Sequence, residues 1–283
     1  MRQVPRELSI KEVERLGYYD FMGYVGVPFF NIGGGASIER LAEMCRIGAG
    51  TRVLEVGCGT GTNACLLAEK YGCTVVGIDI AEHMVAQARR RAEEMGLTDR
   101  VTFMVGNAYR LEFPDASFDA VVTVFVSQFL DPAKVFPEFL RVLRLGGCLG
   151  INEMYRDEDV PAKEEKKVDD AERLFRDLTE LPFTLRSPPA WRRAFEDAGF
   201  ENVSVEVHSN AEEPPYTGDM VEIFGGWGKL LGTLWTIFGY AIRSSIMRKR
   251  FVMISESKKT LLRDKETSKY IGYVLCLGIS DKR

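Results

Sequence analysis

The chain has 283 residues, of which 46% are hydrophobic and 28% are charged. This composition is typical of a globular protein, and it excludes a collagen, a long coiled coil and a wholly disordered chain. The 37 basic and 41 acidic residues give a net charge of −4. A basic excess usually accompanies binding to nucleic acid, so we expect no nucleic-acid partner.

The beginning of the chain and the cysteines bear on the cellular compartment. The first residues lack the basic-then-apolar pattern of an export signal, so we expect a cytoplasmic protein. The six cysteines form no CxxC pair and the chain has two histidines, so we expect no metal site. In a reducing compartment the cysteines are most simply small apolar residues of the core.

Strand and helix patterns alternate along the first half of the chain. In chain order the predicted elements are a helix at 38–46, a strand at 52–56, a helix at 62–71, a strand at 74–80, a helix at 81–95, strands at 101–105 and 118–126, a helix at 132–144 and a strand at 148–154. This alternation predicts an α/β fold with a doubly wound, mostly parallel sheet that is covered by helices on both faces.

The second half of the chain departs from this rhythm. Residues 155–180 are highly charged with a weak helical pattern, and residues 221–242 are very apolar. Between and after them we expect a helix at 187–200, with Ser187 as its N-cap, and strands at 201–209 and 270–280.

The segment VLEVGCGTG, residues 53–61, is a buried strand that leads into a glycine-rich turn and then a helix. Glycines let a ligand lie against the backbone, and the start of the helix offers unpaired N–H donors. Asp79 ends the next strand after the glycine-rich turn. In nucleotide-binding βαβ units, the carboxylate that binds the ribose hydroxyls follows this turn by about 20 residues, and Asp79 stands close to that position. The sequence therefore predicts an adenosine-type ligand at the carboxyl ends of the strands.

Two residues argue against a dinucleotide. Thr62 stands where the pattern G-x-G-x-x-G requires its last glycine. Glu55 lies just before the turn, where a carboxylate would repel a pyrophosphate but suits a ligand that carries an ammonium group.

The segment VLEVGCGTG resembles the first motif of the class I S-adenosylmethionine-dependent methyltransferases. The other motifs of that family follow in order, as VVGIDI, GNA at 106–108, FPDASFDAVV at 113–122 and LRLGG at 143–147, so the resemblance covers about residues 35–152. It implies a seven-stranded sheet in which the strand at 270–280 inserts antiparallel beside the strand at 201–209. It also implies S-adenosylmethionine as cofactor and S-adenosylhomocysteine as product.

The resemblance assigns residues to each part of the cofactor. The glycine turn would line the methionine and ribose, Asp79 would accept both ribose hydroxyls, and the residues after the third strand would meet the adenine. The implied cofactor-binding residues are Glu55, Gly57, Cys58, Gly59, Gly61, Asp79, Ile80, Met84, Asn107, Ala108, Val124 and Phe125.

The acceptor side is less defined by the sequence. Tyr18 and Tyr19 would either fold over the cofactor as a lid or anchor the N-terminal segment. His208 ends the strand at 201–209 and is either a general base or a surface histidine at a loop. Glu153 would pair with a cationic substrate, act as a base, or serve as a structural carboxylate. Further residues predicted to line the acceptor pocket are Gln128, Asn152, Tyr155 and Trp227.

The apolar stretch at 221–242 is long enough to raise the question of a membrane span. Lys229 and five glycines within it weaken that interpretation, and a single crossing would separate two neighbouring strands of the sheet. We therefore expect a helical cap. With the basic residues at 243–250 it would suit a hydrophobic substrate or shallow contact with an anionic membrane, whereas a homodimer contact or a fully buried cap stay as alternatives.

These inferences divide the chain into a lid segment at 1–34, a cofactor-binding core at 35–152 and 186–210, cap insertions at 153–185 and 211–267, and the last core strand at 268–283. The expected function is methyl transfer from S-adenosylmethionine to a small or lipid-like acceptor, by in-line displacement under a mobile cap. The alternatives are a non-catalytic subunit that binds S-adenosylmethionine and, less favoured, an NAD-dependent oxidoreductase. The expected location is cytoplasmic, with peripheral membrane contact as a further option.

Overall fold

The computed structural model describes residues 7–28, 33–209, 221 and 223–281. Its centre is a seven-stranded sheet in the order β3-β2-β1-β4-β5-β7-β6, in which β7 runs antiparallel to both of its neighbours. The strands are β1 (Arg52–Val56), β2 (Thr74–Asp79), β3 (Val101–Val105), β4 (Phe118–Val124), β5 (Leu143–Arg156), β6 (Phe200–His208) and β7 (Ile271–Ser280). This topology confirms the predicted doubly wound, mostly parallel sheet and the antiparallel last strand.

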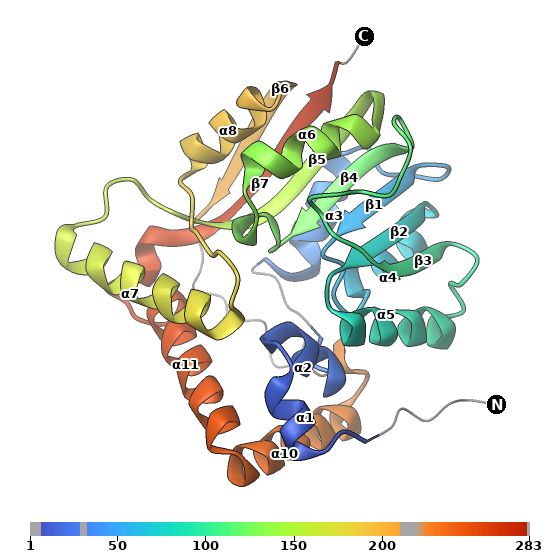
Figure 1. The fold of residues 1–283 in the computed structure, drawn as a ribbon. Coiled ribbons are helices and arrows are strands. Elements are labelled where there is room, and N and C mark those ends of the chain that lie inside the picture. The colour runs from blue at the N-terminus through green and yellow to red at the C-terminus, as the bar shows by residue number, and fades with distance from the viewer. Residues whose placement is uncertain (1–6, 29–32, 210–220, 222, 282–283) are drawn as a thin grey trace.

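Helices cover both faces of the sheet, as Figure 1 shows. On one face lie α3 (Gly34–Met44), α4 (Thr62–Tyr71) and α5 (Glu82–Met95), and on the other lie α6 (Pro132–Val142) and α8 (Pro188–Asp197). Successive residues of one strand face opposite sides of the sheet. In β1, Val53 packs with the first set of helices and Leu54 packs with the second. The sheet is therefore buried on both faces, which explains why its strands read as apolar runs.

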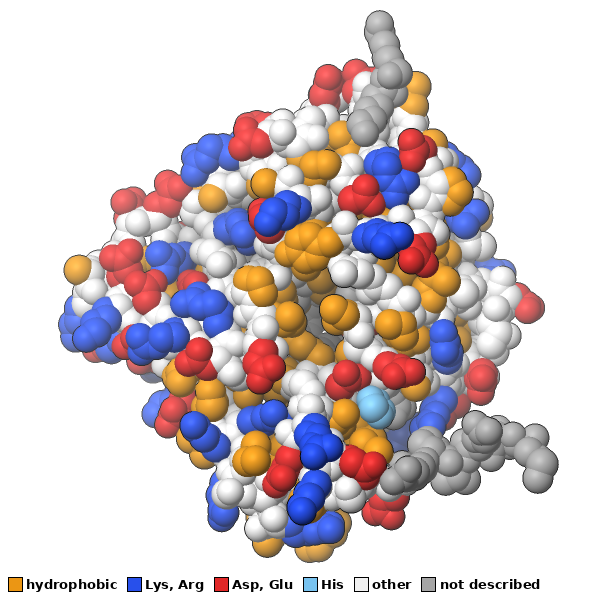
Figure 2. Space-filling model, in the orientation of Figure 1, with side chains coloured by type: hydrophobic (Ala, Val, Ile, Leu, Met, Phe, Trp, Pro, Cys, Tyr) orange, Lys and Arg blue, Asp and Glu red, His pale blue; other side chains and the backbone are white. Residues whose placement is uncertain are grey.

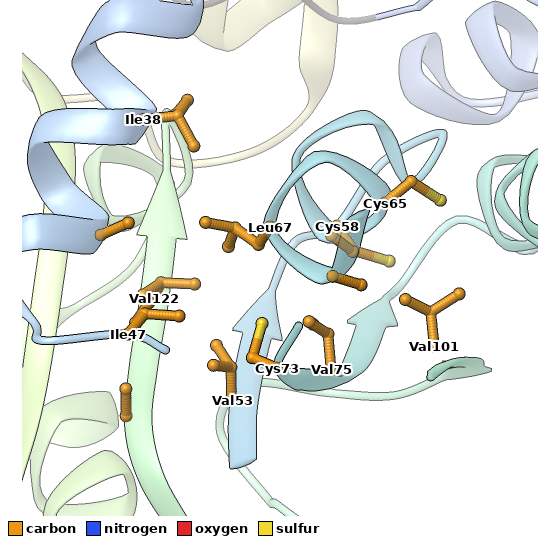
Figure 3. Packing of buried hydrophobic residues seen from close by; sticks show 14 of the residues in the cluster. Ile38, Ile47, Val53, Cys58, Cys65, Leu67, Cys73, Val75, Val101 and Val122 are labelled. Carbon is orange, nitrogen blue, oxygen red and sulfur yellow. The ribbon is translucent and has the colours of Figure 1, made fainter. Parts of the chain in front are cut away.

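All six cysteines are buried and none forms a disulfide. Figure 3 shows three of them, Cys58, Cys65 and Cys73, among the aliphatic side chains between β1, β2 and α4. Burial raises the pKa of the Cys65 thiol to about 12, so this group stays protonated at neutral pH. The interpretation of the cysteines as core residues is confirmed.

Local signals set several helix ends. The Ser187 hydroxyl accepts the Ala190 N–H and Pro188 follows it, so α8 begins where the sequence predicts. The Asp131 carboxylate caps α6 in the same way by accepting the Ala133 N–H. Gly72 takes a left-handed conformation after the last residue of α4, which is the usual role of glycine at a helix end.

Two strands differ in length from their predictions. β4 ends at Val124, because Phe125 adopts a positive φ of 58° and the chain turns into the short 3₁₀ helix η1 (Ser127–Phe129). β5 begins earlier and runs on to Arg156, where it still pairs with Ile271 of β7. The polar residues at the end of β5 thus belong to the sheet.

Beyond the carboxyl edge of the sheet, helices of the described ranges form a separate layer (Figure 1). They are α1 (Ile10–Arg15), α2 (Tyr18–Tyr24), α7 (Ala162–Thr179), α10 (Trp227–Arg243) and α11 (Ser245–Leu262). Buried side chains from segments far apart in the sequence, such as Phe21, Leu178 and Tyr240, meet in one hydrophobic cluster within this layer. None of the helices in the described ranges combines the length and the apolar character that crossing a bilayer requires.

Candidate cofactor site at the carboxyl edge of the sheet

A cavity of about 420 Å³ lies where β1, β2 and β4 end, at the position where ligands bind in open α/β sheets. Figure 2 shows the hollow in the middle of the visible face, with hydrophobic side chains around its mouth. Its walls are formed by Tyr19, Val56, Gly57, Cys58, Gly59, Thr60, Thr62, Asn63, Ile78, Asp79, Ile80, Met84, Gly106, Asn107, Ala108, Tyr109, Val124, Phe125, Val126, Phe129, Leu130, Leu181 and Pro182.

The structure brings most of the predicted cofactor residues to this cavity. The ones that line it are Gly57, Cys58, Gly59, Asp79, Ile80, Met84, Asn107, Ala108, Val124 and Phe125, whereas Glu55 and Gly61 lie outside its walls. Of the residues predicted for the acceptor, only Tyr19 lines it.

Asp79 ties the glycine turn to the next helix. Its Oδ2 accepts the Gly59 N–H at 2.8 Å, and its Oδ1 accepts the Ala81 N–H at 2.9 Å. Burial raises the pKa of this carboxyl group. A carboxylate offers about four acceptor positions, so two hydrogen bonds to the backbone leave capacity for the hydroxyls of a ligand.

The three glycines of the turn have different surroundings. A Cβ on Gly57 would overlap the Val126 side chain, and a Cβ on Gly61 would lie 2.7 Å from the Phe103 ring. A Cβ on Gly59 would meet no atom within 4 Å. Gly57 and Gly61 therefore permit close packing of the protein itself, whereas Gly59 leaves open space beside the cavity.

We expect Gly59→Ala to weaken binding of S-adenosylmethionine, the ligand that the motif implies, because the added methyl group would occupy the space beside the cavity. The φ of 51° at Gly59 should also cost the fold about 1 kcal/mol. Gly50→Ala is the matched control, since Gly50 also has a positive φ and open surroundings but does not line the cavity. Thermal unfolding would measure the stability of both variants, and titration calorimetry would measure their affinity for S-adenosylmethionine. An equal loss of affinity in Gly59→Ala and Gly50→Ala would contradict the prediction.

Glu55 lies behind the cavity wall. It is buried in β1 and helps to line a second, much smaller cavity together with Asn63 and Leu67. Burial raises the pKa of Glu55 to about 8, although a hydrogen bond from the Asn63 side chain opposes this shift. Asn63 lines both cavities, so it connects the Glu55 carboxyl group to the ligand side.

Glu153 also lies one layer behind the wall. It is fully buried, and its Oε1 accepts the Ser127 N–H at 2.7 Å and the Val126 N–H at 3.0 Å. The Thr123 hydroxyl and the Gln128 N–H donate to the same carboxylate. Glu153 thus holds the loop after β4, which gives Phe125 and Val126 to the cavity. Burial raises the pKa of Glu153 to about 7.

The structure does not place His208 at the cavity. Its ring stacks on Tyr273, with 4.5 Å between the centroids and 4° between the planes. It ends β6, the edge strand that lies four strands from β1, and strands are spaced by about 4.8 Å. A separation of roughly 19 Å from the glycine turn is too large for proton transfer to a ligand there.

The other residues predicted to bind the acceptor lie outside the cavity. Asn152 donates to the Ser37 hydroxyl at 2.9 Å, and the Gln128 side-chain oxygen accepts the Met154 N–H at 3.3 Å. Tyr155 is buried in the cluster beneath α6 and α8. Trp227 begins α10 with 60% of its surface exposed, outside the cavity.

The N-terminal helix α2 is both an anchor and a wall. The Asp20 carboxylate accepts the His83 N–H at 3.1 Å, at the start of α5, and Tyr18 packs in the helical layer. Tyr19 lines the cavity and meets the edge of the Phe129 ring at 5.7 Å. Tyr18 thus anchors the segment and Tyr19 borders the cavity, whereas a lid that folds over the cofactor stays a prediction.

Several cavity residues escape prediction from sequence. Thr62 and Asn63 lie in the first turn of α4. The free N–H groups at the start of a helix are the sequence signal that could have predicted them as ligand contacts. Phe129, Leu181 and Pro182 carry no such signal. Among the described residues, no group of three or more His, Cys, Asp or Glu side chains is arranged to hold a metal ion.

Comparison with known proteins places residues 53–147 in a family of methyltransferase domains. The methyltransferase GfsG of Streptomyces halstedii is 40% identical over 114 residues, which are 40% of this chain and 41% of that protein. The 27-O-demethylrifamycin SV methyltransferase of Amycolatopsis mediterranei is 34% identical over 180 residues, which are 63% and 64% of the two chains. The match thus spans less than two thirds of these two relatives.

Among solved structures, the [4+2]-cyclase SpnF has the same fold, with a TM-score of 0.70 and 21% identity. The superposition covers 94% of this chain and 95% of SpnF. The helical layer is therefore part of the shared architecture.

Proposed function

Because the chain belongs to the class I S-adenosylmethionine-dependent methyltransferases, we propose that it transfers a methyl group from S-adenosylmethionine to a small or lipid-like acceptor. The observation that carries the proposal is the arrangement around the cavity, because ten of the twelve residues that the family motifs assign to the cofactor line it together. The chemistry that S-adenosylmethionine supplies when bound is an electrophilic methyl group on a sulfonium.

The residues present fit this cofactor. Gly59 leaves the space that a ligand needs beside the turn, and Asp79 keeps acceptor positions for ribose hydroxyls. The Asn107 side-chain oxygen already accepts the Tyr109 N–H at 2.9 Å. Its amide N–H₂ group is then the part that would donate to the adenine edge. Ile80 is 65% exposed at the cavity rim, where it would cover one face of the base.

The acceptor end of the cavity is apolar. We assign the acceptor to the wall where Tyr19, Phe129 and Leu181 belong to one hydrophobic cluster, and Leu130 and Pro182 line the cavity next to them in the chain. Among the described lining residues there is no lysine, arginine or histidine, and Asp79 is the one carboxylate. A neutral, hydrophobic acceptor suits such a surface, whereas a phosphorylated acceptor would find no cation there.

The wall residues also bear on the need for a base. Burial raises the pKa of Tyr19 well above its usual value, so its phenol stays protonated at neutral pH and cannot accept a proton. The residues of the cavity would act by orienting the two reactants and excluding water. The acceptor is then a group that needs no strong base, such as an amine or an acidic hydroxyl. In this proposal α2 and the segment after α7 close over the acceptor as a cap.

Two alternatives remain to be separated from methyl transfer. The first is a non-catalytic protein that binds S-adenosylmethionine without transferring its methyl group; the [4+2]-cyclase SpnF has the same fold, so the fold alone does not establish methyl transfer. An NAD-dependent oxidoreductase is the second alternative, which the altered glycine pattern disfavours.

Titration calorimetry with S-adenosylmethionine, S-adenosylhomocysteine and NAD is the first test. We expect binding of the two adenosyl sulfur compounds and none of NAD. A panel of apolar phenols and amines should then accept a labelled methyl group, whereas phosphoethanolamine, as the charged control, should not. Binding of NAD without response to S-adenosylhomocysteine would overturn the proposal, and binding without transfer to any acceptor would favour the non-catalytic alternative.

A further inference from the structure

Helix α10 carries an uncovered hydrophobic face. Its exposed large apolar residues, which leave between 50% and 75% of their surface to solvent, are Trp227, Leu231, Leu234, Trp235, Phe238 and Ile242. On a helix with 3.6 residues per turn these positions fall within an arc of about 100°. They form one continuous stripe, which we call the outer face of α10.

The opposite side of the same helix already has its packing partners. Leu230 and Tyr240 are buried, and the Tyr240 ring meets the Phe21 ring of α2 edge-on at 5.7 Å. An amphipathic helix at a protein surface usually turns polar residues outward. The inner side of α10 packs against the rest of the protein. Its outer face is also hydrophobic, so we infer that this face contacts another molecule.

The charges that the segment itself carries are of one sign, although Glu94 pairs with Lys229 and Glu14 accepts the Ser244 hydroxyl from neighbouring helices. Residues 225–255 contain five lysines or arginines and no aspartate or glutamate, in a chain whose net charge is −4. Arg243, Arg248 and Lys249 are exposed, and no carboxylate of the described residues forms an ion pair with them. Ile246 is exposed between them, so cationic and apolar side chains share one corner.

We propose that the outer face of α10 and the basic corner that follows it dock on the surface of an anionic lipid bilayer. Two tryptophans, further apolar side chains and flanking basic residues are the combination that interfacial helices use. The apolar stripe would enter the boundary between headgroups and acyl chains, while the cations would meet lipid phosphates and carboxylates. Figure 1 shows α10 at the lower edge of the molecule, behind α1.

A second copy of the chain suits this surface less well. A symmetric dimer could pair the two apolar stripes, but it would offer no anionic group to the exposed cations Arg243, Arg248 and Lys249. An anionic membrane offers a partner to both the stripe and the cations. The inference goes beyond the proposed methyl transfer and does not depend on it.

The test is cosedimentation of the whole protein with vesicles. We expect binding to vesicles that contain phosphatidylglycerol, weaker binding at raised salt, and little binding to pure phosphatidylcholine. Trp235→Ser with Phe238→Ser should lower the partition coefficient at least about tenfold. Arg248→Gln with Lys249→Gln should lower it roughly 25-fold, at about fivefold for each charge.

Each pair of substitutions has a matched control. Leu145→Ser removes an equally exposed hydrophobic residue at the start of β5, and Arg90→Gln with Lys166→Gln removes two exposed cations elsewhere. Both controls should bind the vesicles like the unaltered protein, and an unchanged midpoint of thermal unfolding would show that the variants are folded. Equal losses in test and control variants, or no binding to anionic vesicles, would overturn the proposal. A dimer that Trp235→Ser abolishes, without vesicle binding, would assign the face to self-association instead.

Discussion

Replacing Asp79 with alanine is expected to weaken binding of S-adenosylhomocysteine by about 1–3 kcal/mol, a loss of roughly 5- to 150-fold in affinity. Asp79 is the one carboxylate among the described cavity residues, and it holds the Gly59 and Ala81 N–H groups in place. The substitution removes both the hydrogen bonds to the ribose and the anchor of the turn. Titration calorimetry measures the combined effect.

A ligand without ribose hydroxyls separates these two contributions. The 2′,3′-dideoxy analogue of S-adenosylhomocysteine should bind the unaltered protein less tightly than the parent compound, and Asp79→Ala should abolish that difference. Asp119→Ala is the control, because Asp119 also accepts a backbone N–H, from Arg52 at 2.8 Å, but does not line the cavity. If a folded Asp79→Ala variant still distinguished the two ligands, the carboxylate would not contact the ribose.

Glu153→Ala is expected to lower the free energy of unfolding by about 3–5 kcal/mol, the loss usual when one partner of a buried charged network is removed. Three backbone N–H groups, from Val126, Ser127 and Gln128, would lose their acceptor, and Ser127 and Gln128 are buried away from water. The same loop lines the cavity, so affinity for the cofactor should fall as well. Urea unfolding measures the first effect, and Glu196→Ala on the exposed side of α8 is the control.

The titration of Glu153 adds a pH dependence with a definite sign. Burial raises the pKa of Glu153 from 4.5 to about 7. Between these values the folded protein keeps a proton that the unfolded chain has released. Stability should therefore fall as the pH rises from about 4.5 to about 7 and then level off with respect to this group. Burial also raises the pKa of Glu55, to about 8. The loss of stability with rising pH should therefore continue to about pH 8.

Glu153→Gln isolates this contribution. The variant keeps the size of the side chain and an oxygen acceptor but cannot ionise, so its stability should decline less between pH 5 and pH 7 than that of the unaltered protein. Urea midpoints at several pH values in this range give the comparison. An identical pH dependence in both proteins would show that Glu153 does not titrate as its burial requires.

The cofactor side of the site could be predicted because its determinants are local. The turn after β1 and the acid at the end of β2 are each short segments whose residue types report directly on backbone conformation and ligand chemistry. The bounds of β1, α4 and β3 follow equally well from apolar runs and terminal glycines. Patterns of this kind need no knowledge of distant contacts.

The acceptor side could not be predicted in the same way. Glu153 and Asn152 follow the pattern of a polar residue at a strand end, and sequence does not tell whether such a side chain faces a cavity or buried N–H donors. His208 lies at the correct edge of the sheet but on its outermost strand, so its distance depends on strand order. The apolar walls at Phe129, Leu181 and Pro182 come from separate segments that only the tertiary structure brings together.

The position of α2 between α5 and α10 affects how the protein can be shortened or tagged. Its Phe21 packs against Tyr240 of α10, its Asp20 caps α5, and its Tyr19 closes one side of the cavity. Deleting the first helices would strip cover from Met84 and Phe129 at once, so the fragment would lose a wall of its binding chamber and expose hydrophobic surface that favours aggregation. Purification tags therefore belong ahead of an intact N-terminus or behind the last strand.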